Sequence, residues 1–103
     1  MYQITERDIP LLREYRDVPS RHHSLPLHRL LTRLRTEGLE GKTFILTVQP
    51  GKEWAIGQLG NRRDDPITFH DERRFDTFKA AQWALLRLRW EKHAGIPWPE
   101  DLD

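Results

Sequence analysis

The first candidates for a catalytic or metal-binding role in this chain are three histidines: His22, His23 and His28. Three imidazoles within seven residues could bind a metal ion, because neutral histidine is a common metal ligand. However, no carboxylate accompanies them at the spacing that histidine-based metal motifs use. We therefore interpret them as solvent-exposed histidines beside the start of a helix.

Other candidate catalytic groups lack partners at a useful spacing. Ser20 and Ser24 lie near the histidines in sequence, but nothing around them indicates a nucleophile elbow or an oxyanion hole. The run His70–Glu72 is typical of a polar strand exit. Residues 57–61 contain two glycines but no phosphate-binding GxxxxGK pattern. The sequence therefore predicts no catalytic residue, metal ligand or cofactor site in this chain.

The composition restricts the possible classes of protein. The chain has 103 residues, of which 37% are hydrophobic and 32% charged, so we expect one small soluble domain. It has no cysteine, which excludes disulfides and thiolate metal sites and agrees with a cytoplasmic location. Neither a signal peptide nor an apolar run of transmembrane length is recognisable, so no membrane partner is expected.

The N-terminal part of the chain predicts an arm, residues 1–21, followed by a well-signalled helix. In the arm, Asp8 could cap a short helix that ends at Pro19. Ser24 is a suitable N-cap for the second helix, with Pro26 in its first turn. Gly38 or Gly41 would end that helix. Four leucines follow the spacing of one buried helical face: Leu27, Leu30, Leu31 and Leu34.

Three strands and a long helix are predicted next. The segments KTFILTV and EWAIGQL flank the turn QPGK, and PITFH is a third short strand. If Pro50 and Gly51 are the central turn residues, one sheet face carries Phe44, Leu46, Val48, Ala55, Gly57 and Leu59. We expect this face, with its small residues, to pack against helices, which leaves Ile45, Trp54 and Ile56 on the outer face.

The predicted fold is therefore α+β. A short N-terminal arm is followed by the order α-β-β-β-α in residues 22–94, with both helices on one face of a three-stranded antiparallel sheet. Residues 95–103 form a Pro-rich tail. Asp76 or Thr77 caps the last helix, 78–93, and Gly95 ends it.

The last helix has two apolar faces where a surface helix needs only one. At about 100° per residue, Trp83, Leu86 and Trp90 fall opposite the face that contains Ala81 and Leu85. The arm or the tail, including Trp98, could cover part of this second face. Because the sheet's outer face with Trp54 and Ile56 also lacks a cover, we expect a protein partner. The predicted interface residues are Trp83, Leu86, Trp90, Trp54, Ile56 and Trp98.

Two other kinds of partner stay open. The order α-β-β-β-α is also that of double-stranded RNA-binding domains, and Arg29, Arg33 and Arg35 could contact phosphates. A net charge of +1 and carboxylates interleaved with the arginines make nucleic acid the less favoured partner. The same tryptophans could instead face each other in a homodimeric scaffold, so a homo-oligomer is possible.

A family resemblance adds to this interpretation. The ordered motifs HSLPLHRLLTRLR, GKTFILTVQPGKEWAIGQL and DPITFHDERRFDTFKAAQWALLRLRWEKH resemble the small subunit of N,N-dimethylformamidase. The resemblance covers residues 22–93, and the arm gives no clear match. It implies a non-catalytic small subunit that binds and stabilises a larger catalytic subunit. That larger subunit would hold the iron site and hydrolyse the amide, so this chain would itself need no cofactor.

Overall fold

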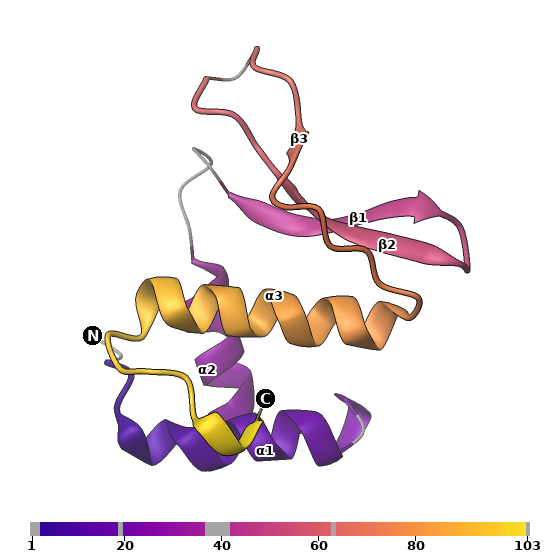
Figure 1. Cartoon of the computed structure of the whole chain (residues 1–103). Coiled ribbons are helices and arrows are strands. Elements are labelled where there is room, and N and C mark those ends of the chain that lie inside the picture. Colours follow the sequence, from indigo (N-terminus) through magenta and orange to yellow (C-terminus); the bar gives the residue numbers. More distant parts are fainter. Residues whose placement is uncertain (1–2, 19, 37–41, 63, 103) are drawn as a thin grey trace. The chain divides into compact units, whose positions relative to one another are not determined.

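The computed structural model describes residues 3–18, 20–36, 42–62 and 64–102 (Figure 1). It confirms the α+β class, the order α-β-β-β-α after an N-terminal arm, and a three-stranded antiparallel sheet of order β1-β2-β3. The elements in chain order are η1 (Glu6–Asp8), α1 (Ile9–Asp17), η2 (Ser20–His22), α2 (Leu25–Arg35), β1 (Thr43–Gln49), β2 (Glu53–Gln58), β3 (Thr68–Phe69), α3 (Phe78–His93) and η3 (Glu100–Leu102).

The chain forms two compact units. The first comprises Met1–Thr36 and Arg87–Asp103, and the second comprises Glu37–Leu86. The predicted arm and the predicted tail thus share the first unit with α2 and the end of α3. The second unit contains the sheet and the beginning of α3.

In the first unit, α1 and α2 both bury leucines, and α2 begins at a side-chain cap. Thr5 donates its backbone N–H to Asp8 Oδ2 at 2.9 Å, so Asp8 completes the cap of η1 and makes no side-chain cap for α1. Ser24 caps α2 as predicted, and all four predicted leucines of that helix are buried. The predicted helix stops at Pro19, Gly38 and Gly41 lie outside the described residues.

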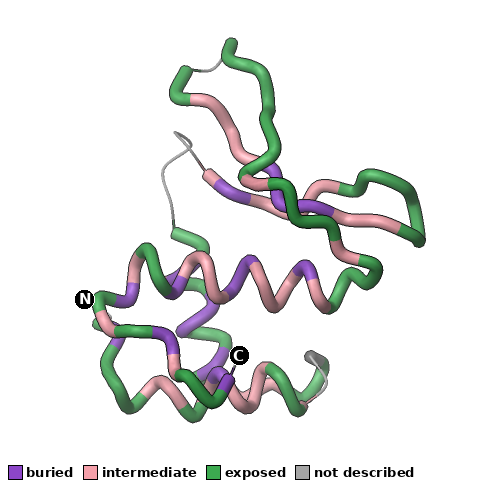
Figure 2. The backbone as a smooth tube through the Cα atoms, in the orientation of Figure 1, coloured by how far each residue is buried: buried purple, intermediate pink, exposed green. Residues whose placement is uncertain are grey.

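In the second unit, a tight turn sets the register of the β1–β2 hairpin. Lys52 N–H donates to Gln49 O at 3.0 Å, and Gly51 has a φ of +74°, as the third residue of a type II turn requires. Phe44 then lies opposite Gly57, and Leu46 opposite Ala55, as predicted. A register shift follows Thr47, beside the turn. Figure 2 shows the connection between the two strands as exposed and the middle of β2 as buried.

The third strand is shorter than predicted, because only Thr68 and Phe69 pair with β2 as a ladder. The pairing resumes at Phe75, which exchanges two backbone hydrogen bonds of 2.8 and 2.9 Å with Trp54. Between them, His70 still donates its backbone N–H to Ile56 O at 2.8 Å, whereas residues 71–74 lie outside the strands. Thr77 Oγ1 then accepts the Ala80 N–H at 3.1 Å and caps α3, which spans Phe78–His93 as predicted.

Candidate partner interface

Two of the residues that could have formed a catalytic or metal site, His23 and Ser24, make structural contacts. His23 Nε2 lies 2.9 Å from Val18 O, and its ring lies 5.4 Å from that of Tyr15. The Ser24 hydroxyl donates to Glu14 Oε1 at 2.7 Å and accepts the Leu27 N–H. Across the described ranges, no three His, Cys, Asp or Glu side chains are grouped so that they could hold a metal ion.

Glu14 joins α1 to the beginning of α2. Its carboxylate accepts the backbone N–H of Ser24 at 2.5 Å as well as the hydroxyl. These two hydrogen bonds, the backbone one first, lower the pKa of Glu14 below its ordinary value of 4.5, because they favour the charged form. The contact therefore sets where α2 begins and belongs to the fold of the first unit.

The C-terminal tail covers Trp90. This side chain is fully buried, and its indole N–H donates to Ile96 O at 3.0 Å and lies 3.3 Å from Pro97 O. The ring of Trp98 meets it edge-on, with the centroids 6.4 Å apart. Gly95, with a φ of +77°, allows the chain to turn back after the helix. Trp90 and Trp98 thus form the interior of the first unit, as the self-covering alternative predicted.

Two further residues of the predicted interface are also buried: Leu86 is 4% exposed and Ile56 is 0% exposed. Trp54 and Trp83 are half-buried. The ring of Trp54 lies 6.2 Å from that of Phe78, at the beginning of α3. Four of the six predicted interface side chains are therefore enclosed in the chain, and only Trp54 and Trp83 keep accessible surface for a partner.

The two faces of the sheet are the reverse of the prediction. The face with Ile45, Trp54 and Ile56 was expected to be the outer one, but Ile56 is fully buried and Trp54 contacts α3. We call the opposite face the outer sheet face; the strand pairing places on it the apolar side chains of Phe44, Leu46, Ala55, Leu59 and Phe69. Phe69 is 49% exposed, Phe44, Leu46 and Leu59 are half-buried, and Ala55 is fully buried. Two exposed apolar residues lie beside the paired residues: Val48 at the register shift, 36% exposed, and Ile67 directly before β3, 56% exposed.

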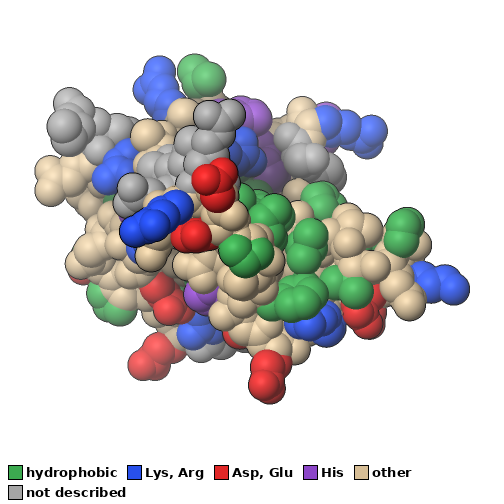
Figure 3. Space-filling model, turned by 90° about the horizontal axis from the view of Figure 1, so that it is seen from above, with side chains coloured by type: hydrophobic (Ala, Val, Ile, Leu, Met, Phe, Trp, Pro, Cys, Tyr) green, Lys and Arg blue, Asp and Glu red, His purple; other side chains and the backbone are tan. Residues whose placement is uncertain are grey.

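The outer sheet face is continuous across all three strands. Gly57 pairs with Phe44 on one side and with Phe69 on the other, so these residues lie in one row on the same face. Its missing side chain leaves room for the Phe44 ring, since a Cβ at Gly57 would lie 2.8 Å from Phe44 Cζ. Figure 3 shows hydrophobic side chains lying next to one another on the face that it views.

Cationic side chains border the outer sheet face at β3. The Arg74 guanidinium lies over the Phe69 ring, 4.2 Å from its centroid, and also donates to Arg73 O. Arg73 forms an ion pair with Asp71 at 2.9 Å. Burial raises the pKa of Asp71, but the hydrogen bonds from Arg73 outweigh it, so the net pKa is lowered. An arginine stacked on an exposed phenylalanine is a combination that binding hot spots favour.

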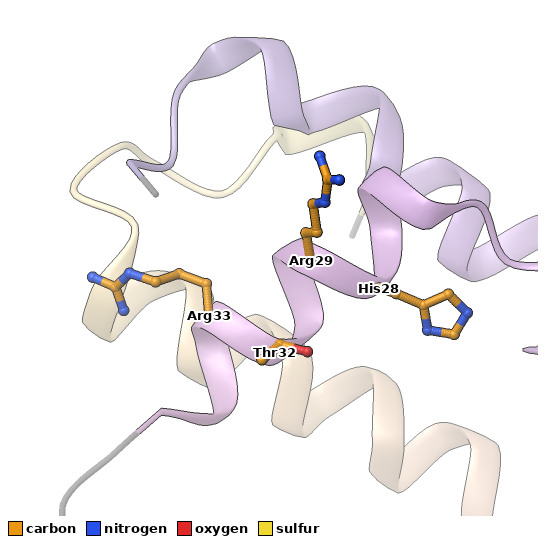
Figure 4. A pocket seen from close by; sticks show the side chains of 4 residues that line it. All are labelled: His28, Arg29, Thr32 and Arg33. Carbon is orange, nitrogen blue, oxygen red and sulfur yellow. The ribbon is translucent and has the colours of Figure 1, made fainter. Parts of the chain in front are cut away.

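The arginines of the nucleic-acid alternative lie on α2. His28, Arg29, Thr32 and Arg33 line a shallow hollow of about 370 Å³, and Figure 4 shows the Arg29 and Arg33 guanidinium groups pointing in different directions. Arg35, the last residue of α2, is exposed. Divergent guanidinium groups do not converge on one phosphate, so this face offers no preformed anion clamp.

Sequence reasoning missed Ile67, Phe69 and the outward direction of Phe44. The alternation of these residues was visible in the sequence. The sequence did not show which face of the sheet α3 covers.

In the described part of the chain, no helix is long and apolar enough to cross a membrane.

Comparison with known proteins gives one family. The family model of the N,N-dimethylformamidase alpha subunit matches residues 4–96. The match includes most of the N-terminal arm, so the expectation that the resemblance begins at residue 22 is wrong. No curated protein matches the chain.

Proposed function

The chain belongs to the family of N,N-dimethylformamidase alpha subunits, and on this premise we propose that it is a non-catalytic small subunit. In this proposal it binds and stabilises a larger catalytic subunit through the outer sheet face. The larger subunit carries out the amide hydrolysis and holds the iron that the resemblance implies. The assembly is a cytoplasmic hetero-oligomer.

The observation that carries this proposal is the accessible apolar surface of the outer sheet face. Clusters of exposed apolar side chains on soluble proteins mark binding sites. Phe69 and Ile67 are about half exposed although both are large and apolar. The neighbouring Arg74 supplies a cation at the border, where a carboxylate of the partner would pair with it.

The test is capture of the partner from the native cells with tagged chain, after nuclease treatment and a high-salt wash. We expect a stoichiometric complex with one larger protein, identified by native mass spectrometry, that hydrolyses N,N-dimethylformamide. Phe69→Ser and Ile67→Ser are expected to lose the larger protein. Leu25→Ser is the matched control, because Leu25 is 65% exposed on α2, in the first unit, and should retain it.

Two results would contradict the proposal. A captured complex that all three variants retain equally would remove the outer sheet face from the interface. A chain recovered alone, or with nucleic acid only when nuclease and salt are omitted, would favour the arginines of α2 instead, since phosphate contacts weaken steeply with salt.

A further inference from the structure

The segment between β3 and α3 carries two consecutive arginines that lie over aromatic rings of opposite sheet faces. The Arg74 guanidinium is 4.2 Å from the ring centroid of Phe69, which belongs to the outer sheet face. The Arg73 guanidinium is 5.7 Å from the ring centroid of Phe75. Phe75 pairs with Trp54, and directly opposite residues project to the same face, so Phe75 belongs to the face that Trp54 occupies.

The charges of these two arginines are compensated differently within the chain. Arg73 forms an ion pair of 2.9 Å with Asp71, and its backbone N–H donates to the same carboxylate at 2.9 Å. Arg74 donates a hydrogen bond to Arg73 O at 2.9 Å. Among the described residues, no carboxylate forms an ion pair with Arg74. The positive charge of Arg74 is therefore available at the outer sheet face, whereas that of Arg73 is neutralised by its own chain.

The position of Arg74 is favourable for binding a carboxylate. A guanidinium is planar, so its face can lie over an aromatic ring while the N–H groups in its plane remain available to an anion. Two of these N–H groups match the two oxygens of a carboxylate. The hydrogen bond to Arg73 O and the contact with Phe69 already restrict the side chain, so less conformational entropy is lost when an anion binds.

The surroundings of this guanidinium are mainly apolar. Phe69 is 49% exposed, and Ile67, directly before β3, is 56% exposed. Glu53 is the only charged residue within the three strands. A purely acidic ligand would leave the two apolar side chains in water, and a purely apolar ligand would bury the guanidinium without a counter-charge. A ligand of this corner must therefore bring both an apolar group and a negative charge.

We propose that Arg74 and Phe69 bind an aspartate or glutamate side chain of the larger subunit, next to an apolar residue of that subunit. The carboxylate pairs with the guanidinium, and the apolar residue covers Phe69 and Ile67. Covering this surface excludes water, which strengthens the charge pair. This inference rests on the proposed function, because it names the chemistry of the surface that the larger subunit presents to the outer sheet face.

The first test compares two variants that remove the same charge from adjacent positions, Arg74→Gln and Arg73→Gln. Each tagged chain captures the larger protein from nuclease-treated native cells, and release of that protein is followed over time in an excess of untagged chain. Removing one partner of a buried charge pair acts mainly on the dissociation rate. We expect release to be about tenfold faster from Arg74→Gln and unchanged from Arg73→Gln.

The second test identifies the chemical group that contacts Arg74. A carbodiimide forms an amide bond between a lysine amine and a carboxylate that touch each other. Arg74→Lys keeps the positive charge and supplies the amine, so in the complex it should be joined to an aspartate or glutamate of the larger protein. Arg73→Lys is the matched control, because its amine would lie next to Asp71 and should be joined within its own chain. Mass spectrometry of the cross-linked peptides distinguishes the two products.

The outcomes separate this inference from the proposed function. If Phe69→Ser loses the larger protein but Arg74→Gln releases it no faster than the unmodified chain, the proposed function stands and this inference is overturned. Equal acceleration by Arg73→Gln and Arg74→Gln also overturns it, since net charge alone would then explain the effect. Cross-links from Arg74→Lys that reach only a second copy of the chain would assign the site to self-association. A chain that captures no larger protein overturns both proposals. Circular dichroism checks that each variant is folded.

Discussion

The two units of this chain use similar apolar side chains in opposite ways. In the first unit, the Pro-containing tail returns over Trp90 and places Trp98 against it, so a large aromatic surface becomes interior. In the second unit, Phe69 lies on a sheet face and Ile67 directly before β3, and both keep about half of their surface exposed. An aromatic residue is thus a core residue or a candidate contact according to whether a nearby segment can reach over it.

The difference also shows in the polar contacts. The indole N–H of Trp90 is satisfied by carbonyls of the tail, which makes its burial complete and energetically favourable. Phe69 is accompanied by the cation of Arg74, whose charge stays in water. The first arrangement stabilises the fold, whereas the second leaves an apolar and cationic surface that a partner can cover.

The largest expected effect is the loss of Trp90. Trp90→Ala should lower the free energy of unfolding by about 3–5 kcal/mol, because it leaves a cavity where the tail now packs. Urea denaturation followed by circular dichroism measures this. The same truncation at the exposed Phe69 is the control, and we expect a change within about 1 kcal/mol. Equal losses of unfolding free energy at both positions would mean that Trp90 and Phe69 do not differ in burial.

A smaller effect is expected within the second unit. Gly57→Ala should lower the free energy of unfolding by about 1–3 kcal/mol, because its Cβ would lie 2.8 Å from Phe44 Cζ and the ring must move. Phe44→Leu combined with Gly57→Ala should recover part of the loss. If Gly57→Ala alone leaves urea stability unchanged, the Phe44 ring does not rest on this position.

The smallest effect concerns the hydrogen bonds between Glu14 and Ser24 in the first unit. The folded-state pKa of Glu14 is lowered, so its ionised form stabilises the fold above its ordinary pKa of 4.5, and this stability is lost as the pH falls through the lowered value. Glu14→Gln should therefore reduce stability at neutral pH and make little difference in acid. Thermal unfolding at several pH values checks this, and a loss that persists unchanged in acid would contradict it.

Most of the local structure could be predicted from the sequence. Local signals are short-range: Ser24 and Thr77 accept backbone N–H groups three residues away, and Gly51 adopts the positive φ of its turn. The hairpin register follows from that turn, so the pairing of Phe44 with Gly57 was predictable. The two-residue length of β3 was not, because the resumption of pairing at Phe75 depends on contacts outside the strand.

The candidate interface was predicted less well. The expectation of an accessible apolar sheet face was sound, yet the wrong face was chosen, because small residues such as Ala55 and Gly57 suggested a closely packed helix. In the structure, Gly57 makes room for Phe44 instead. Which face Trp54 and Ile56 occupy depends on where α3 lies, and α3 is distant in sequence.

The sequence by itself determined the helices, the hairpin, its register and the sets of residues that share a face, since each depends on neighbours within a few positions. Only the tertiary structure decided which sets became interior. Trp90 is buried because the chain turns at Gly95 and carries Trp98 back over it. Phe69 lies under the Arg74 guanidinium and remains 49% exposed. A periodic pattern shows which residues share a face. Whether that face is buried depends on long-range packing, which the pattern does not specify.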